Sequence, residues 1–192
     1  MKERLIRTFV AISAPNDVKN VKQMLISTME EDKAEIRWVK HSNLHLTVKF
    51  LGFTPENDIS SLSKDLDTIA KANSPFDLSV SGTGCFPSES KPSVLFLGVS
   101  GNINALSKLV KDTEVLMTDR GYPKLESDYF PHITIARIKY PQKFSPDITS
   151  FLNSSYDSID FRVNHLQFFS SEILPEGAVS YTHLTLPTIY SV

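Results

Sequence analysis

The sequence contains one cysteine, Cys85, which excludes an internal disulfide and a cysteine-rich zinc site. We interpret Cys85 as a buried small apolar residue. No apolar run approaches the roughly 20 residues of a membrane-spanning helix. Residues 1–13 are basic, but their apolar run is short and no small-residue cleavage site follows. We therefore expect a first strand there and a cytoplasmic protein with no membrane partner.

The chain also lacks an excess of charge of either sign. Its 20 Lys and Arg and 22 Asp and Glu residues give a formal net charge of −2 at pH 7. A protein that wraps a long stretch of nucleic acid carries a large positive excess. Any nucleic acid partner would therefore be held at a terminus or as a short piece.

Strand and helix patterns are both present in the 192 residues, of which 41% are hydrophobic, as in one globular domain. Branched and aromatic runs predict strands at 5–13, 36–39, 44–52, 76–81, 94–99, 130–138 and 161–170. Apolar spacings of three and four predict helices within 16–29, 55–72 and 102–120, and a short helix at 145–156. Strands and helices do not alternate strictly, so we predict an α+β fold with mostly antiparallel sheet.

Two segments repeat one pattern, His-aliphatic-Thr-aliphatic: residues 44–50, LHLTVKF, and residues 131–137, PHITIAR. Side chains alternate between the faces of a strand, so His45 projects with Thr47, and His132 projects with Thr134. We predict that the buried face of the first strand consists of Leu44, Leu46, Val48 and Phe50, and that of the second of Ile133 and Ile135. Each strand thus offers one imidazole beside one hydroxyl.

This pairing suits phosphoester chemistry, because an imidazole with a pKa near 6.5 can take or give a proton at neutral pH. Threonine hydroxyls can donate to non-bridging phosphate oxygens. Arg137 is a nearby cation, but strict alternation places it on the opposite face from His132. A β-bulge, or a strand that ends near Ala136, is needed to bring Arg137 to the site.

Other features receive structural interpretations. Gly82 and Gly84 lack the rest of a phosphate loop and predict a turn. His41 and His165 do not match the motif and are interpreted as ordinary polar residues. A metal site is the alternative for paired histidines, but no Asp, Glu or Cys stands at ligand spacing beside either one. We expect neither a metal nor another cofactor.

The sequence resembles the 2H phosphoesterases, which are named for two His-x-Thr/Ser motifs, and within them the RNA 2′,3′-cyclic phosphodiesterases, also called 2′-5′ RNA ligases. The similarity runs from about Arg7 to Gly177 and includes residues 7–12, 37–39, 45–52, 84–87, 94–99 and 130–137. It implies a bilobal fold, in which two pseudo-symmetric lobes, each with a small antiparallel sheet and outer helices, face a central cleft.

The resemblance also implies a reaction and its residues. The reaction is metal-independent hydrolysis of a 2′,3′-cyclic phosphate at an RNA end to a 2′-phosphate, with slow reversible 2′-5′ joining in some members. His45 and His132 would be the acid–base pair. The phosphate would be held by Thr47, Thr134 and Arg137. Phe9 matches a family aromatic that can stack on the terminal base. Our hypothesis is that His132 activates water and His45 protonates the leaving 3′ oxygen.

Residues 179–192 depart from this family, which closes with a strand carrying Lys or Arg. They contain no charged residue, and they hold a third His-aliphatic-Thr pattern at His183 that we set aside. One permitted back-translation of residues 179–188 resembles a transposon-type library adapter. We therefore predict one bilobal domain at 1–178 and a non-native tail at 179–192, which the DNA sequence of the locus would test.

Two alternatives remain open at this point. The substrate could be a small cyclic nucleotide instead of an RNA end, or the protein could be a catalytically idle RNA- or nucleotide-binding module. A binding module has no need of two imidazoles, which favours an enzyme. No obligate protein partner is predicted, and we expect a monomer.

Overall fold

The computed structural model describes residues 4–29, 34–174 and 177–185, with residues 172–174 and 177–185 described as backbone only. The strands are β1 (Leu5–Ser13), β2 (Ile36–Trp38), β3 (His45–Pro55), β4 (Phe76–Phe86), β5 (Val94–Gly101), β6 (His132–Ile138), β7 (Ile159–Val163), β8 (Gln167–Leu174) and β9 (Gly177–Thr185). The α-helices are α1 (Val18–Ile26), α2 (Ile59–Lys71), α3 (Ile103–Asp119) and α4 (Thr149–Leu152). Short 3₁₀ turns, η1 (His41–Asn43) and η2 (Glu56–Asp58), precede β3 and α2.

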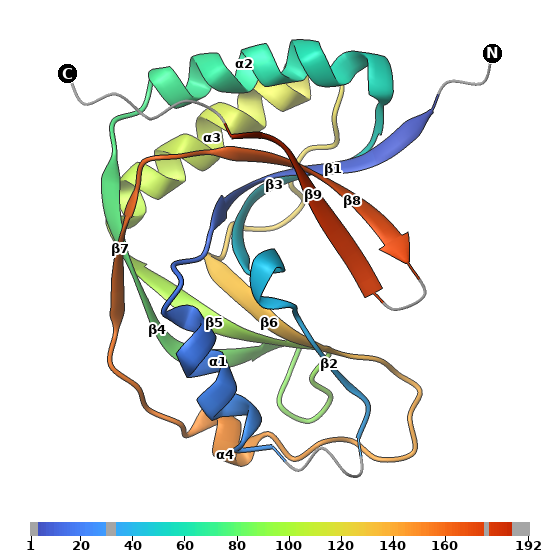
Figure 1. Ribbon diagram of the computed structural model, residues 1–192, viewed down its shortest axis with the longest axis vertical. Coiled ribbons are helices and arrows are strands. Elements are labelled where there is room, and N and C mark those ends of the chain that lie inside the picture. The colour runs from blue at the N-terminus through green and yellow to red at the C-terminus, as the bar shows by residue number, and fades with distance from the viewer. Residues whose placement is uncertain (1–3, 30–33, 175–176, 186–192) are drawn as a thin grey trace.

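The strands form one strongly curled antiparallel sheet in the order β7-β4-β5-β6-β3-β1-β8-β9, with β2 paired to β6 (Figure 1). The predicted α+β class with antiparallel sheet is confirmed. The resemblance implies a separate small sheet in each lobe, but the structure has one continuous sheet. Its two parts are joined where β3 and β6 pair at Leu46 and Ile133.

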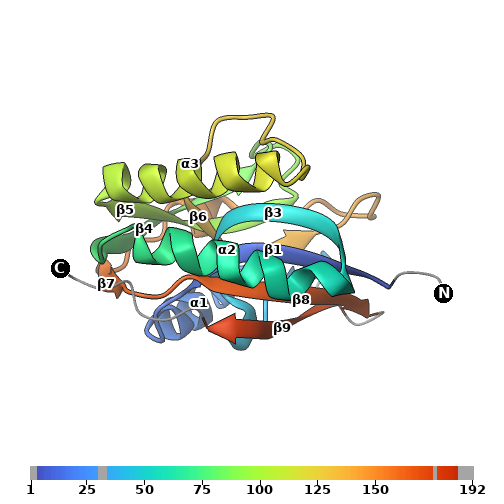
Figure 2. The same ribbon diagram turned by 90° about the horizontal axis from the view of Figure 1, so that it is seen from above.

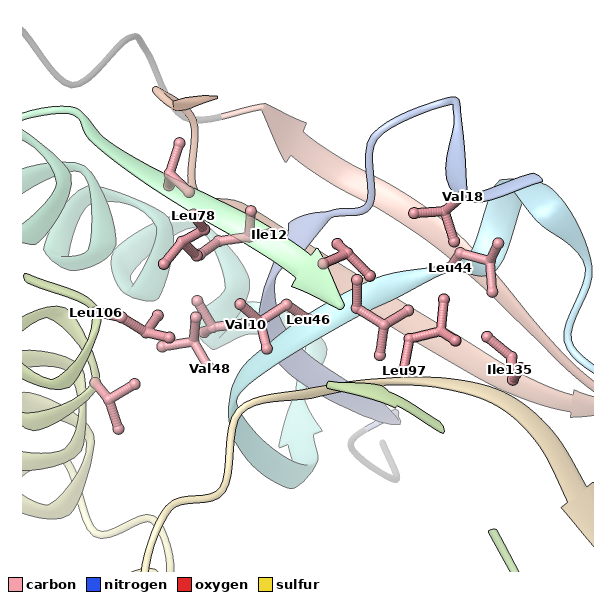
Figure 3. Close-up of a cluster of buried hydrophobic side chains, with 14 of the residues drawn as sticks. Val10, Ile12, Val18, Leu44, Leu46, Val48, Leu78, Leu97, Leu106 and Ile135 are labelled. Atoms are coloured by element: carbon pink, nitrogen blue, oxygen red, sulfur yellow. The ribbon is translucent and has the colours of Figure 1, made fainter. Parts of the chain in front are cut away.

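The main core lies between one face of this sheet and the helices α2 and α3, which run side by side (Figure 2). Alternate residues of β1 and β3, such as Val10, Leu46 and Val48, point into it (Figure 3). Leu106 of α3 is fully buried against them. Helix α3 begins as predicted, because the Asn102 side chain accepts a hydrogen bond from the Ala105 N–H at 3.1 Å.

Three local predictions were wrong. The single strand predicted at 161–170 is two strands, β7 and β8, which lie far apart in the strand order of the sheet. Gly82 is not in a turn but in the middle of β4, where Ser81 pairs with Gly98 and Thr83 with Leu97, so Gly82 is the extra residue of a β-bulge. Its φ of +70° explains why glycine suits that position. The predicted helix at 145–156 is reduced to α4, four residues long.

The predicted boundary between residues 178 and 179 falls inside β9, which pairs with β8 from Gly177 to Thr185 with one register shift. The backbone therefore places the start of the predicted tail in an edge strand. Residues 186–192 lie outside the described part of the chain, and the non-native origin of 179–192 stays a prediction. Within the described residues, no helix is long and apolar enough to cross a membrane.

Candidate active site

The two His-Thr strands are neighbours in the sheet. Leu46 of β3 pairs with Ile133 of β6 in antiparallel register, and both side chains are buried on the helix-covered face. The residues on either side of this pair point to the opposite face. One step along the register places His45 next to Thr134 and Thr47 next to His132, within the spacing of cross-strand neighbours. The structure thus brings the four motif residues together, with the two histidines on one diagonal.

A β-bulge at Ile135 brings Arg137 to the same face. Leu95 of β5 pairs with Ala136, whereas the next residue, Phe96, pairs with Thr134, so β6 has one extra residue there. Ile135 and Ala136 are consequently both buried, and alternation resumes with Arg137 exposed on the face of Thr134. This is the bulge that the sequence required for Arg137 to reach the site.

The first strand has a bulge at the equivalent place. Val10 of β1 pairs with Lys49 and Ala11 with Thr47, which makes Val48 the extra residue of β3. Phe50, five residues after His45, is therefore exposed on the site face as Arg137 is, five residues after His132. The prediction that Phe50 is buried was wrong, because strict alternation does not hold beyond the bulge at Val48. The bulge needed for Arg137 was a signal that could have corrected it.

Both imidazoles are held in the same way by the backbone. His45 Nδ1 lies 2.7 Å from the Asn43 carbonyl oxygen, and His132 Nδ1 lies 2.8 Å from the Phe130 carbonyl oxygen. A carbonyl oxygen only accepts, so each Nδ1 carries a hydrogen and donates it. The neutral form of each ring then has its lone pair on Nε2, which is the arrangement that a general base needs.

His45 is electrostatically different from an imidazole in water. Burial is the largest cause that lowers its pKa, because the charged form loses solvent. The hydrogen bond to the Asn43 carbonyl acts in the opposite direction, and the positive charges of Arg137 and His132 lower the pKa further. These effects favour the neutral form of His45, and a bound anion would favour its charged form.

Phenylalanine rings surround each histidine. The ring centroid of His45 lies 4.8 Å from that of Phe9, which in turn stacks on Phe169 at 5.0 Å. His132 lies 5.1 Å from Phe86 and 5.3 Å from Phe96. Phe9 is only 4% exposed, so almost none of its surface is open to a nucleobase, and its contact is with the His45 ring.

Two further contacts, which sequence reasoning missed, hold the segment that precedes the second motif. Tyr129 donates its hydroxyl hydrogen to the Thr47 carbonyl oxygen at 2.8 Å, and burial raises the pKa of Tyr129. Lys49, buried on the helix-covered face, bonds Glu114 of α3 at 2.8 Å and the Pro123 carbonyl oxygen at 2.7 Å. Nothing in a single sequence pairs residues so far apart along the chain.

The other histidines and Cys85 have different surroundings. His41 belongs to η1, and His165 Nδ1 contacts the Asn164 side chain. Burial raises the pKa of the Cys85 thiol, which opposes thiolate formation. The side chain of His183 lies outside the described residues. Among the side chains that the structure describes, no group of three or more His, Cys, Asp or Glu residues is placed to hold a metal ion.

Comparison with known proteins gives the class. The family model described as LigT like Phosphoesterase matches residues 12–96. The fold is that of a Thermus thermophilus protein solved by crystallography (TM-score 0.79, 23% identity, 96% of this chain and 98% of that one). It is also that of E. coli LigT solved with 3′-AMP (TM-score 0.75, 18% identity, 98% and 100%). These structures show the fold, and the family model together with the relatives described next places the chain among the LigT-like 2H phosphoesterases, which are hydrolases.

Comparison with curated relatives identifies the family within this class. The chain is 30% identical over 180 residues to the RNA 2′,3′-cyclic phosphodiesterase of Aquifex aeolicus, covering 92% of this chain and 94% of the relative. It is 31% identical over 175 residues to that of Thermotoga maritima, covering 91% of each. The chain belongs to the RNA 2′,3′-cyclic phosphodiesterase family.

Proposed function

We propose that this protein hydrolyses the 2′,3′-cyclic phosphate at an RNA end to a 2′-phosphate by metal-independent acid–base catalysis. The observation that carries the proposal is the pairing of β3 with β6 at Leu46 and Ile133, which supports a site with His45 and His132 on opposite sides of one phosphate. Family membership supports the substrate class.

In the proposed reaction His132 Nε2 takes a proton from water as the water oxygen attacks phosphorus. The bond between phosphorus and O3′ breaks, and the protonated Nε2 of His45 gives its hydrogen to O3′. The anionic substrate supplies the charge that favours protonated His45, against the burial that otherwise lowers its pKa. Each proton transfer contributes about 10²–10⁴ in rate.

The remaining residues bind the phosphate and the base. Thr47 and Thr134 donate hydroxyl hydrogens to the non-bridging oxygens, where negative charge develops, and Arg137 adds a positive charge. Phe9, which is 4% exposed, positions the His45 ring instead of stacking on a base. Phe50, 59% exposed on the same face, takes the base-stacking role in this proposal.

We further propose that the site lies in a cleft between two pseudo-symmetric halves. The support is a repeated register: β1 pairs with β3, and β5 with β6, in the same order around the same bulge. Val10 opposite Lys49 corresponds to Leu95 opposite Ala136. Ser13 opposite His45 likewise corresponds to Gly98 opposite His132.

The test uses an oligonucleotide that ends in a 2′,3′-cyclic phosphate, with the position of the product phosphate identified. Wild-type protein should form the 2′-phosphate in excess chelator, with a bell-shaped dependence of rate on pH. His45→Ala and His132→Ala should each lose at least about 10²-fold in kcat/KM. Full activity in either variant would refute the assignment, and loss of activity in chelator would revive a metal mechanism.

Parallel reactions address the alternatives. Turnover of 2′,3′-cyclic mononucleotides alone would favour a small-nucleotide phosphodiesterase, and binding without turnover would favour an idle module. Adding an oligonucleotide with a 5′-hydroxyl, and looking for a 2′-5′ linked product, tests the reverse joining reaction.

A further inference from the structure

The site face of the sheet continues past the histidines along β1 and β3 and carries exposed side chains there. Arg7 of β1 pairs with Phe53 of β3, and both are exposed. Phe53 is 69% exposed, more than the neighbouring Phe50 at 59%, and Leu5 beyond them is 55% exposed. Leu5, Phe50 and Phe53 thus place three exposed apolar side chains on one face, and grouped apolar side chains of this kind mark surfaces that bind a partner or ligand.

Bulges in β3 keep these residues on the face of the histidines. In β1 the alternation is uninterrupted, so Arg7 shares a face with Phe9 and with Ser13, the residue that pairs with His45. In β3 a second register shift, which makes Leu51 an extra residue, allows Phe50 and Phe53 to point to this same face although they are three residues apart.

This surface lies beyond the reach of one nucleotide. Arg7 lies six positions before Ser13 in β1, which corresponds to about 20 Å along the strand. A mononucleotide with its cyclic phosphate between the two histidines would extend to Phe50, whose ring is 5.9 Å from that of Phe9. Arg7 and Phe53 therefore have no part in holding a mononucleotide.

The chemistry of the pair fits single-stranded RNA. Aromatic rings that stack on bases and cations that contact phosphates are the two elements of sequence-tolerant single-strand binding. They recur here on one face, in line with the site for the terminal phosphate. A cyclic phosphate ends its strand at the 3′ side, so the rest of an RNA substrate must leave the site in one direction.

We propose that Arg7 and Phe53 form a subsite for the nucleotides upstream of the cyclic phosphate, which selects RNA ends over cyclic mononucleotides. The inference rests on the proposed function and adds a determinant of substrate length. Phe53 stacks on an upstream base, and Arg7 contacts a phosphate that a mononucleotide does not have.

The experiment compares kcat/KM for a 2′,3′-cyclic mononucleotide with that for oligonucleotides of two to five residues ending in the same group. Wild-type kcat/KM should rise with length. Phe53→Ala should lower kcat/KM for the longer substrates about 5- to 150-fold, the range that removal of one stacked base predicts. It should change kcat/KM for the mononucleotide less than about twofold, because this substrate does not reach the ring. Arg7→Gln should reduce the salt dependence of oligonucleotide binding by a log–log slope of about 0.7.

The controls remove another exposed apolar side chain and another exposed cation, both on the helix α3. Val115→Ala and Lys111→Gln on α3 should leave both the length preference and the salt slope unchanged. Equal losses on short and long substrates in Phe53→Ala, or no length preference in wild type, would overturn the subsite. A wild-type dimer that becomes a monomer in Phe53→Ala, with the length preference unchanged, would also overturn the subsite, because Phe53 would then belong to a contact between protein copies.

Failure of the catalytic proposal is distinguishable from failure of the subsite. If no substrate is turned over, anisotropy of a fluorescent oligonucleotide still measures binding. Affinity that grows with length and falls in Phe53→Ala would then support the subsite in a protein without the proposed activity. Affinity independent of length would overturn it.

Discussion

Replacement of Lys49 by methionine tests whether a buried ion pair holds the two motif strands and the intervening segment together. The Lys49 side chain is only 4% exposed, with Nζ between Glu114 Oε2 and the Pro123 carbonyl oxygen. Glu114 Oε1 also accepts a hydrogen bond from the Leu125 N–H at 2.7 Å. One lysine therefore connects β3, which carries the first motif, to α3 and to the segment that leads to the second.

The expected loss of unfolding free energy arises from the carboxylate that remains after the substitution. In Lys49→Met the Glu114 carboxylate keeps its charge without its cation, and breaking a buried pair on one side costs about 3–5 kcal/mol. Glu114 is 17% exposed and keeps the Leu125 hydrogen bond, so we expect the lower end, about 3 kcal/mol. For a chain of this size, that lowers Tm by about 6–12 °C. The double variant with Glu114→Gln should recover most of the loss.

Urea unfolding as a function of pH checks both magnitude and cause. Burial alone would raise the pKa of Glu114, but the hydrogen bonds from Lys49 and the Leu125 N–H, with nearby positive charges, lower it overall. A carboxyl with a depressed folded pKa stabilises above its unfolded pKa, near 4.5, and loses that contribution as pH falls through the folded value. The gap between wild type and Lys49→Met should be full at pH 7 and narrow below about pH 4.5.

A matched control is Lys108→Met, which removes an exposed lysine paired with Asp112 and should cost at most about 1 kcal/mol. A Lys49→Met variant no less stable than this control would refute the argument for a buried link. Failure of the double variant to recover stability would show that the cost has another source.

Two further substitutions address the geometry around the histidines. Tyr129→Phe removes the hydrogen bond to the Thr47 carbonyl oxygen and should cost about 1 kcal/mol in unfolding free energy. It should also lower kcat several-fold at nearly constant KM. Unchanged steady-state kinetics would contradict a positioning role for Tyr129. Gly84→Ala would place a Cβ against the Phe96 ring, which lies beside His132. The change should cost about 1–3 kcal/mol in unfolding free energy and lower kcat/KM. Wild-type stability and kcat/KM would show that the ring moves freely.

Local patterns in the sequence predicted the elements that local interactions stabilise. The limits of α3 followed from the Asn102 cap and an apolar stripe that packs on the sheet. Up to the bulges, the faces of the motif strands followed from alternation, and Leu46 and Ile133 are buried as expected. Beyond the bulge at Val48 the prediction failed, because Phe50 is exposed instead of buried. The bulge at Ile135 was foreseen only as a condition on Arg137, because a bulge depends on the register of the neighbouring strand.

Features set by distant contacts could not be predicted. Phe9 is covered by Phe169 of β8, at the other end of the chain, so its burial left no signal near residue 9. The link between Lys49 and Glu114 exists only once α3 lies on the sheet. The wrong prediction of a turn at Gly82 has the same cause. A glycine with positive φ is suited to a turn and to a bulge, and only the pairing of the strand distinguishes the two.

The two motif strands use one backbone arrangement to present different side chains, and this difference suits an asymmetric substrate. Each has a Nδ1 hydrogen bond to the carbonyl two residues earlier and a bulge three residues after the histidine. At the fifth position one half has the aromatic Phe50 and the other the cationic Arg137. A cyclic nucleotide likewise has a base on one side and an anionic phosphate on the other. In the proposed reaction, the orientation in which the substrate binds between these unmatched flanking residues therefore determines which of the two matched histidines is the acid and which is the base.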